Sequence, residues 1–504
     1  MSQRLVTTAE MRALEQAAVD YGVSLETLMD NAGAALAREV RKLRPPGRAL
    51  VLVGPGNNGG DGLVAAQHLH GSGWQVNLRL APARERDQAR FPVLRSVQPG
   101  PVPETPMDVI VDALLGTGKS RPAEGPIADA LDEVRTRHPR AIVVAADVPS
   151  GVDADTGAAD PRTLRARVTV TFGAAKVGLY QYPAAELAGE VRVADIGIPA
   201  AVADPLRTWL SDAELVRPFL PRRPQDAHKG TFGKLLVLAG AVSYTGAPYL
   251  TSMAAMRAGA GLVRLATPRS AHAVIAARLV EATFAPLPET EDGWLAAAAL
   301  DRLRELLARD GYDCLLIGPG LGQDPQTREV VETLLLEHTA DLPSRIVIDA
   351  DGLNILSGVD DWHQRLPRGC VLTPHPAEFG RLAGLPTAEV VANRFELARD
   401  KARDWGQVIV AKGANCIVAG PDGRTVIDPG ANPLVATAGT GDVLAGAIAG
   451  TLTQGADPWE GAVAAVRACS LAATSLAPVY GRGGMIASDL HAAIPRAIKA
   501  LRGD

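Results

Sequence analysis

The stretch ALVLVGPGNNGGDG, residues 49–62, decides how the first part of the chain is interpreted. Five apolar residues lead into nine residues of which five are glycine, and a helix-like segment follows at residues 63–69. This order predicts a strand, a tight turn and a helix, and glycine lets such a turn approach a phosphate. The turn has neither the Lys-Ser/Thr ending of a P-loop nor the G-x-G-x-x-G dinucleotide spacing. The pattern alone leaves a ligand site and a plain tight turn equally open.

The same alternation of apolar runs and helical segments continues along the chain. The runs cover residues 49–53, 75–80, 108–112, 141–146, 167–171, 234–239, 262–266, 313–317, 345–349, 371–373, 408–411 and 416–419. Continuous Val, Ile and Leu runs separated by amphipathic stretches indicate parallel sheets covered on both faces. Two helices precede the first run, one capped by Thr7 with Glu10 and one starting at about Ser24. The fold class is therefore α/β.

Length alone suggests two to four domains, and the pattern along the chain indicates two. The chain has 504 residues, of which 47% are hydrophobic and 21% charged, enough for large cores. The segment VRPFLPRRPQDAHKG, residues 216–230, holds three prolines and several charges, so we place a linker within residues 211–229. The predicted domains are residues 1–215 and 225–504.

Several classes of protein do not fit the composition. A net charge of −5 gives no argument for a nucleic-acid or membrane partner. Four well-separated cysteines without a C-x-x-C pair argue against zinc and disulfides, and fit a cytoplasmic location. No signal peptide is visible, and the uncharged residues 235–256 contain the glycines and proline of a strand, loop and helix. Exposed helices of both domains leave room for a homo-oligomer.

Three strand ends of the first domain carry polar motifs. The motifs are GPGNNGGDG at residues 54–62, VDALLGTGKSRP at residues 111–122 and DVPSGVDADTG at residues 147–157. Ligands bind at the carboxyl ends of strands in open parallel sheets, and Asn58, Asp112 and Ser150 could offer hard oxygens to a cation. Asp112 could instead cap a helix, and Asp147 could start a turn. Three such ends together favour a phosphate-containing ligand with one or two working carboxylates.

The sharpest motif of the second domain is TAGTGDVLAGAIAG, residues 437–450. Backbone N–H groups of Gly439, Thr440 and Gly441 would converge at a helix start and form an anion hole. Asp442 beside that hole suits a general base that deprotonates a hydroxyl during phosphoryl transfer. The alternative, an aspartate that only complements the helix dipole, is weakened by the preceding glycines.

Four further strand ends of this domain are polar. They are GPGLGQD at residues 318–324, DADGLN at 349–354, TPHPAEF at 373–379 and KGANCIVAG at 412–420. His375 lies between prolines and is not expected in a packed core, although a loop hydrogen bond would also explain it. Glu378 could cap the short helix after Pro376 or orient water around a magnesium ion.

The N-terminal motifs, together with LMDNAG at residues 28–33, closely resemble the NAD(P)HX epimerase or YjeF N-terminal family. That family has a Rossmann-like three-layer fold and interconverts the R and S epimers of hydrated nicotinamide dinucleotides. The resemblance implies Asp147 as the acid/base and a potassium ion at Asn58, Asp112 and Ser150. The dinucleotide contacts that it implies are Asn57, Asn58, Gly59, Gly60, Asp61, Gly116, Thr117, Gly118, Lys119, Ser120, Arg121, Pro122 and Asp147.

The C-terminal motifs, with HKGTFGKLLVLAG at residues 228–240 and SYTGAPYL at 243–250, resemble the ADP/ATP-dependent NAD(P)HX dehydratase family. That family has the ribokinase-like fold, and its bacterial members generally use ADP. The resemblance implies Asp442 as the catalytic residue and Mg²⁺ with ADP as the phosphoryl donor. It implies nucleotide contacts from Lys412, Gly413, Ala414, Asn415, Cys416 and Gly441, and substrate contacts from Ala247, Gly322, His375 and Asp442.

Both resemblances imply one repair function. Phosphorylation turns the hydroxyl of the hydrated ring into a good leaving group, and the epimerase converts the epimer that the dehydratase does not accept. Two other interpretations remain open. The C-terminal domain could be a vitamin or sugar kinase with a fused regulatory domain, which would make a stable phosphate ester. The N-terminal domain could be a binding scaffold, in which Asp147→Asn would leave turnover of the R epimer unchanged.

Overall fold

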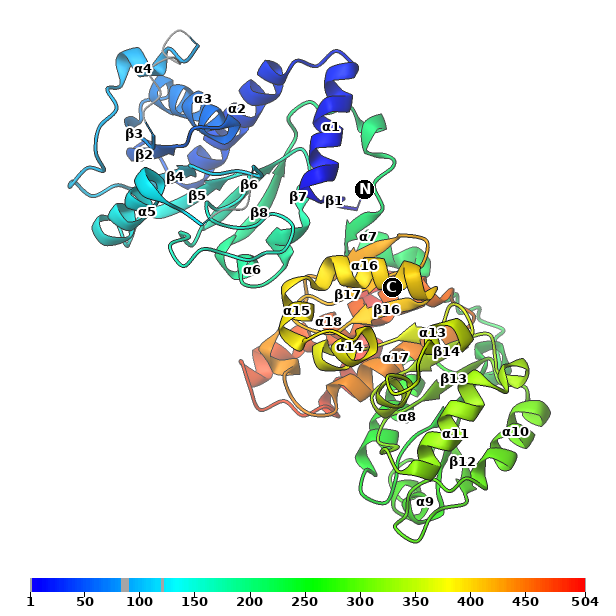
Figure 1. Cartoon of the computed structure of the whole chain (residues 1–504). Helices are drawn as coiled ribbons and strands as arrows, with labels where there is room; N and C mark the ends of the chain where they lie inside the picture. The colour runs from blue at the N-terminus through cyan, green and yellow to red at the C-terminus, as the bar shows by residue number, and fades with distance from the viewer. Residues whose placement is uncertain (1, 83–89, 119–121, 504) are drawn as a thin grey trace. The chain divides into compact units, whose positions relative to one another are not determined.

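The computed structural model describes residues 2–82, 90–118 and 122–503, which form two compact units (Figure 1). The N-terminal unit comprises Gln3–Thr208, and the C-terminal unit comprises Trp209–Asp504 with the first residues of the chain. The domain limits 1–215 and 225–504 stay a prediction. The segment expected as a linker lies within the C-terminal unit, where α7 (Ala213–Val216) contacts α18 (Pro458–Tyr480).

The N-terminal unit is built on a six-stranded parallel sheet, as the apolar runs predict. Its order is β3 (Gln75–Leu80), β2 (Arg48–Val53), β4 (Val109–Ala113), β5 (Ile142–Ala146), β6 (Val168–Phe172) and β8 (Glu190–Ala194). The chain moves from β2 to β3 on one side and then returns to β4 on the other side. The carboxyl ends of β2 and β4 therefore flank a topological switch point, where ligands bind in such sheets.

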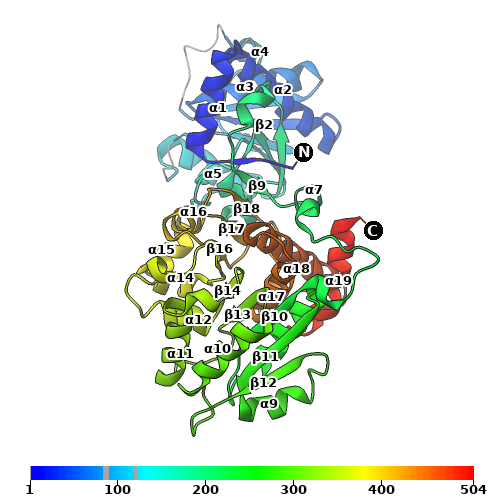
Figure 2. The same cartoon turned by 90° about the vertical axis from the view of Figure 1, so that its right-hand side faces the viewer.

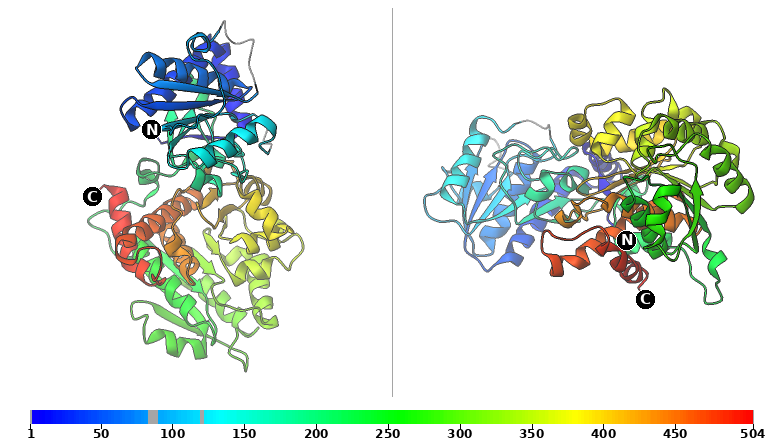
Figure 3. Two further views of the ribbon diagram at one scale, coloured as in Figure 1. Left: turned by 90° about the vertical axis from the view of Figure 1, so that its left-hand side faces the viewer. Right: turned by 90° about the horizontal axis from the view of Figure 1, so that it is seen from below.

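Helices cover both faces of this sheet. On one face lie α2 (Leu25–Leu43) and α3 (Asn57–Gly71), and on the other lies α5 (Gly125–Arg137) (Figure 3, left). In β2, Val51 packs in the core under α2 and α3, whereas Leu50 packs in the core with α5. Successive strand residues point to opposite faces, so a strand buried on both faces becomes a continuous apolar run.

A small second sheet holds the first helix. In it β1 (Leu5–Val6) pairs in parallel with β7 (Ala175–Lys176), and Val6 faces Lys176 in register. The helix α1 (Thr8–Asp20) follows directly, and the predicted capping box of Thr7 and Glu10 is confirmed. Neither β1 nor β7 is predicted from the sequence, because strands of two residues form only when they pair with another segment.

The C-terminal unit contains a ten-stranded sheet. Its order is β12 (Thr283–Leu287), β11 (Leu262–Pro268), β10 (Lys234–Leu238), β13 (Cys314–Ile317), β14 (Ile346–Ile348), β15 (Val371–Leu372), β16 (Val408–Ala411), β17 (Ile417–Ala419), β18 (Thr425–Ile427) and β9 (Thr208–Leu210). Pairing is parallel from β12 to β16, whereas β17 and β18 are antiparallel. The connection at residues 412–416 is too short for a crossover helix, so β17 reverses direction.

This sheet is also covered on both faces (Figure 2). One face carries α8 (Gly246–Ala258), α17 (Thr440–Thr453), α18 and α19 (Asp489–Arg502). The other face carries α10 (Ala299–Asp310), α11 (Pro325–Leu336), α12 (Asp351–Leu356), α14 (Pro376–Ala383) and α16 (Arg394–Trp405). The α/β class expected of both domains is confirmed, with helices on both faces of each sheet.

One described helix, α18, is long and apolar enough to cross a membrane. Its buried residues pack against α17 and α19 in the core of the C-terminal unit. Residues 235–256, for which the sequence analysis rejected a membrane span, form most of β10, a loop and most of α8.

Candidate functional sites

A cavity of about 400 Å³ lies at the switch point of the N-terminal sheet. Its walls include the turns after β2 and β4, and also Phe172 and Lys176. Of the predicted dinucleotide contacts, Asn57, Asn58, Asp61, Gly116, Thr117, Gly118 and Asp147 line it. Gly59, Gly60 and Pro122 are described but are not part of the lining, and Lys119, Ser120 and Arg121 lie outside the described residues.

Glycine brings the two turns into direct backbone contact. The N–H of Gly54 donates to the carbonyl of Ala113 at 3.0 Å. A Cβ at Gly54 would lie only 1.7 Å from the carbonyl oxygen of Leu114, so a larger residue has no room. The side chain of Asn58 adds a second link, since its Nδ2 donates to the carbonyl of Leu115 at 2.8 Å. The conformation of residues 54–62 therefore depends on their contacts with the turn after β4.

Asp112 and Ser150 contact each other, and Ser150 and Asn58 both contact Leu115. Asp112 is fully buried and accepts from the backbone N–H of Ser150 at 2.9 Å and from its hydroxyl at 2.6 Å. The Ser150 hydroxyl oxygen accepts from the N–H of Leu115 at 2.9 Å. Burial raises the pKa of Asp112, and the hydrogen bonds from Ser150 oppose that rise.

The Oδ1 atom of Asn58 is buried and has no hydrogen-bond partner among the described residues. A buried carbonyl oxygen without a donor is costly, and so is a buried carboxylate without a cation. Both costs fall when a cation binds to the oxygens of Asn58, Asp112 and Ser150. The three residues therefore fit a cation with oxygen ligands, as potassium prefers.

Asp147 follows β5 with a backbone φ of +64°, a left-handed value that is strained for aspartate. Its Oδ1 accepts from the hydroxyl of Thr171 and from the N–H of Phe172, each at 3.2 Å. The same oxygen forms a salt bridge with the ammonium of Lys176, which is 1% exposed. Lys176 belongs to none of the predicted sites, although a single charge within the apolar run FGAAKVGLY was a usable signal.

Two more acids line this cavity. Burial raises the pKa of Asp61 well above its ordinary value, and the charges of Asp147 and Glu15 raise it further. Burial also raises the pKa of Glu15, although the nearby Lys176 opposes this. Glu15 comes from α1, which precedes every recognised motif, and its neighbour Arg12 also lines the cavity.

In the C-terminal unit, the strand ends after β14, β15 and β16 meet around Lys412. Its ammonium donates to Oδ1 of Asp349 at 2.7 Å and lies 3.8 Å from a carboxylate oxygen of Glu378. Thr373 donates to the same Asp349 oxygen at 2.7 Å. Burial lowers the pKa of Lys412, but the two carboxylates outweigh it and the pKa is raised overall. Asp349 belongs to the DADGLN motif and had no predicted role.

Asp442 lies in the first turn of α17, which begins after Gly439 in a left-handed conformation. Burial raises the pKa of Asp442 to about 7, and the charge of Asp349 adds to this while Lys412 opposes it. A Cβ at Gly441 would lie 3.4 Å from the Lys412 Nζ atom. The start of α17, with Asp442 in its first turn, and the Lys412–Asp349 pair therefore form one site.

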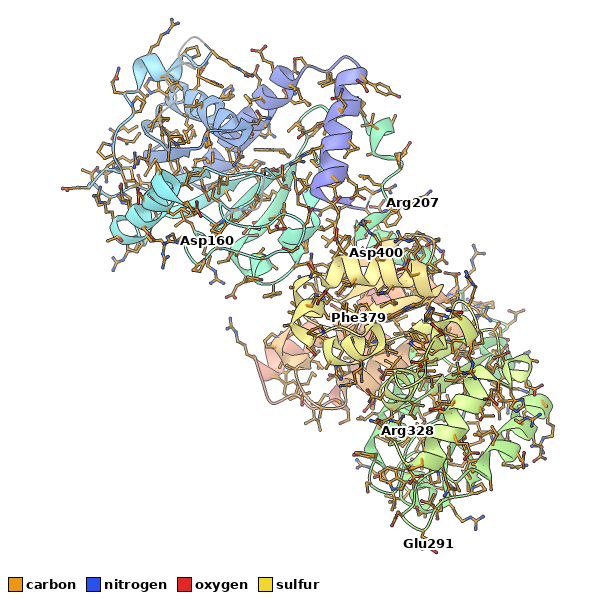
Figure 4. All side chains as sticks on the ribbon, in the orientation of Figure 1. Asp160, Arg207, Glu291, Arg328, Phe379 and Asp400 are labelled. Carbon is orange, nitrogen blue, oxygen red and sulfur yellow. The ribbon has the colours of Figure 1, made fainter. Side chains whose placement is uncertain are left out.

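His375 and Glu378 form the capping box of α14. His375 Nδ1 accepts from the N–H groups of Ala377 and Glu378, and the carboxylate of Glu378 accepts from the N–H of His375 at 2.8 Å. Burial and the charge of Lys412 lower the pKa of His375. The helix is anchored by Phe379, which is labelled in Figure 4 and packs against Trp405 of α16. The capping role of Glu378 is confirmed, and its magnesium role stays a prediction.

Arg394 forms hydrogen bonds with the loop that follows β16. Arg394 donates to the carbonyls of Ala414 and Asn415, and a Cβ at Gly413 would lie 1.9 Å from its Nη1 atom. Burial raises the pKa of the Cys416 thiol to about 12.

The two remaining predicted contacts lie in the turns after β10 and β13. Ala247 is in the first turn of α8. A Cβ atom added at Gly320 would lie 3.1 Å from the Cβ atom of Ala247. The N–H of Gly322 donates to Asp351 at 2.9 Å. Asp351 also raises the pKa of Asp442 through its charge.

Comparison with known proteins assigns both units. Residues 25–178 match the family described as YjeF-related protein N-terminus, and residues 235–496 match the NAD(P)H-hydrate dehydratase family. The protein named bifunctional NAD(P)H-hydrate repair enzyme Nnr from Thermofilum pendens is 38% identical, over 99% of this chain and 97% of its own length. The protein of the same name from Moorella thermoacetica is also 38% identical, with the same two coverages.

Solved structures resemble the C-terminal unit. The ADP/ATP-dependent NAD(P)H-hydrate dehydratase of Bacillus subtilis, co-crystallised with ATP and Mg²⁺, is 31% identical with a TM-score of 0.51. The similarity covers 58% of this chain and 98% of that one. A ribokinase-like superfamily protein from Enterococcus faecalis, 26% identical with a TM-score of 0.50, covers 58% of this chain and 96% of its own. The chain belongs to the family of bifunctional NAD(P)H-hydrate repair enzymes.

Proposed function

We propose that this chain repairs hydrated NADH and NADPH at two sites. The N-terminal unit interconverts the R and S epimers, and the C-terminal unit dehydrates the S epimer with a phosphoryl group from ADP. The observation that carries this proposal is that each unit holds an aspartate, Asp147 or Asp442, in a polar site at the carboxyl ends of a parallel sheet. The two aspartates are surrounded by the glycine-rich turns of the two matched families.

The epimerase chemistry needs one proton carrier. Water adds to an enamine so that the hydroxyl lies on the carbon beside the nitrogen, and such a carbon loses its configuration when the ring opens. Asp147 accepts the hydroxyl proton as the carbon–oxygen double bond forms and the carbon–nitrogen electron pair moves to nitrogen. Asp147 then returns the proton to that nitrogen. Closure on the other face reverses these transfers and gives the other epimer.

Asn58, Asp112 and Ser150 would hold a potassium ion behind the two turns. When bound, the ion would supply positive charge that balances the buried oxygens of these three residues. The support for this assignment is that, among the described residues, Oδ1 of Asn58 has no hydrogen-bond partner and the buried carboxylate of Asp112 has no salt bridge.

The dehydratase chemistry is a phosphoryl transfer followed by an elimination. Asp442 takes the hydroxyl proton while the substrate oxygen bonds to the terminal phosphorus of ADP and AMP leaves. Phosphate then departs with the carbon–oxygen electron pair, aided by the lone pair of the ring nitrogen. Loss of a proton from the neighbouring carbon restores the double bond of the reduced cofactor.

The C-terminal site offers charge for the nucleotide. Lys412 and the N–H groups at the start of α17 would contact the phosphates. No three His, Cys, Asp or Glu side chains in the described parts of the chain are placed to hold a metal by themselves. Mg²⁺ would therefore be bound mainly by the nucleotide phosphates and water, as is usual for this ion.

The test uses the whole chain with mixed epimers, ADP and Mg²⁺. The reduced-nicotinamide absorbance should return completely, with one free phosphate and one AMP for each molecule repaired. Asp147→Asn should repair the S fraction and leave the R fraction to uncatalysed epimerisation. A stable phosphate ester in place of free phosphate would identify a kinase instead, and no recovery would refute the proposal. ATP in place of ADP determines the donor.

We also place the protein in the cytoplasm and expect a homo-oligomer. All four cysteines are free thiols, which fits a reducing compartment. Light scattering of the purified chain measures its oligomeric state.

A further inference from the structure

We propose that Lys176 is a positioning residue of the epimerase, which holds Asp147 ionised and leaves its Oδ2 as the proton-carrying atom. The inference rests on the proposed acid/base role of Asp147. Lys176 lies 29 positions after Asp147 and belongs to none of the motifs found in the sequence.

The two carboxylate oxygens of Asp147 differ in their hydrogen-bond partners. Oδ1 accepts from the Lys176 ammonium, the Thr171 hydroxyl and the Phe172 N–H. Within the described part of the chain, no donor is recorded for Oδ2. A carboxylate with one saturated oxygen can exchange a proton only through the other. Because Asp147 lines the cavity, Oδ2 is the oxygen available to a substrate there.

Lys176 has no hydrogen left for a substrate. An ammonium has three donors, and those of Lys176 reach Asp147, the Thr171 hydroxyl oxygen at 3.2 Å and the Phe172 carbonyl at 3.1 Å. With 1% of its surface exposed, the side chain is enclosed by these partners. It therefore acts on the reaction through Asp147 and not by direct contact.

The charges around Asp147 show why the ammonium of Lys176 is needed beside it. Glu15 of α1 and Asp61 of α3 face the same cavity, so negative charge on Asp147 is opposed by burial and by two nearby acids. Arg12 is exposed at the surface, and Arg90 acts on Asp61, whereas Lys176 is in direct contact with Asp147. A buried carboxylate keeps its charge only when it is paired and hydrogen-bonded.

The two-stranded sheet of β1 and β7 positions Lys176. Lys176 is the last residue of β7 and is in register with Val6 of β1. The same β1 leads through Thr7 into α1, which brings Glu15 to the cavity. The pairing of β1 with β7 therefore positions both Lys176 and Glu15 at the site.

The test compares pH profiles of epimerisation for the wild type and Lys176→Met, which keeps the apolar length of the side chain and removes its charge. Without the ammonium, Asp147 favours its protonated form. The acidic limb of kcat/KM should therefore move up by at least about one pH unit, which lowers the rate about tenfold or more at pH values below the limb. The rate should recover at higher pH, with KM little changed. Lys42→Met, which removes an exposed lysine of the same unit, should leave the profile unchanged.

Dehydration of the pure S epimer by the same variants checks that the chain is folded. The limb should shift equally in a Glu15→Gln background, which assigns it to Asp147, and Lys176→Met should cause no further loss in an Asp147→Asn background. A loss that is equal at every pH, an unchanged profile, or a limb that disappears with Glu15→Gln would each overturn the proposal.

A measurement on the wild type does not depend on the folding of any variant. Carboxyl ¹³C resonances, assigned by comparison with Asp147→Asn, should show Asp147 as a carboxylate in contact with Lys176. A protonated Asp147 near neutral pH would overturn the role of Lys176. Full epimerase activity in Asp147→Asn would instead refute the proposed function of Asp147 itself, so the two failures are distinguishable.

Discussion

At the scale of single residues, two aspartates in one chain have opposite electrostatic surroundings. Asp147 is in direct contact with the buried ammonium of Lys176, which favours its charged form. Asp442 has no such contact among the described residues, and burial with the charge of Asp349 raises its pKa to about 7. A side chain's neighbours, more than its type, decide which charge state it favours.

The first prediction concerns Asp442. Asp442→Asn should lower kcat for dehydration of the S epimer by about 10²- to 10⁴-fold, because the general base is lost. Single-turnover assays measure this loss, and ADP binding should remain within about threefold of wild type, which calorimetry measures. Epimerisation should be unaffected, and Asp404→Asn at an exposed position should match the wild type. Undiminished dehydration would contradict the assignment.

The second prediction is the pH dependence of the same step. A base must lose its proton to act, and Asp442 has a raised pKa of about 7. Dehydration kcat/KM should therefore rise with pH through about 7 and level off above it. Asp442→Asn should remove this limb from the remaining activity. A rate that is flat from about pH 5 to about pH 8 would show that another group is the base.

The third prediction concerns the cation. Replacing potassium by tetramethylammonium should lower the thermal unfolding temperature of the N-terminal unit, because the cation then no longer binds the folded state. Asn58→Ala should abolish this potassium dependence, since it removes the unpartnered buried oxygen. Asn57→Ala, at the exposed neighbouring position, should keep it. Equal potassium effects in both variants, measured by calorimetry, would disprove the site.

At the scale of elements, the turns after β2 and β4 form one structure, because Gly54 lets their backbones touch. The sequence predicted both turns, since glycine runs after apolar runs are a local signal. It did not predict β1, β7, β8, β9, β12 or β18. Strands as short as β1 and β7 are stabilised by pairing with distant segments, and that pairing leaves no local pattern.

The fourth prediction tests that contact. Gly54→Ala should lower the free energy of unfolding of the N-terminal unit by more than about 2 kcal/mol, because its Cβ would overlap a backbone oxygen that cannot move aside. Gly56→Ala is the matched control, since a Cβ there meets nothing within 4 Å and its φ is −93°. It should cost less than about 1 kcal/mol. Equal costs in urea unfolding would argue against the close approach.

At the scale of the whole molecule, the two units have separate hydrophobic cores. One forms around α2, α3 and the six-stranded sheet, and the other around α8, α17, α18 and the ten-stranded sheet. Each unit therefore holds its own site at the carboxyl ends of its own sheet. This arrangement lets one chain combine two reactions without sharing catalytic groups.

The fifth prediction follows from the separate cores. Calorimetry should resolve two unfolding transitions, and ADP with Mg²⁺ should raise only that of the C-terminal unit. At a hundredfold excess over Kd the stabilisation should be about 2.7 kcal/mol. Lys412→Met should weaken this effect, because Lys412 is the predicted phosphate contact. A shift of both transitions would mean that the units unfold together.

The sequence by itself determined the α/β class, both glycine-rich sites and the family resemblance, because apolar runs, glycine turns and strand-end motifs are local patterns. The bounds of β3 and β16 equal the predicted runs. Only the tertiary structure decided the partners of those motifs. It paired Lys176 with Asp147 and Lys412 with Asp349, and it brought Glu15 of α1 to a cavity between later strands. The physical reason is that burial and charge contacts join residues far apart in the chain, and those contacts form only when the strands pair in register.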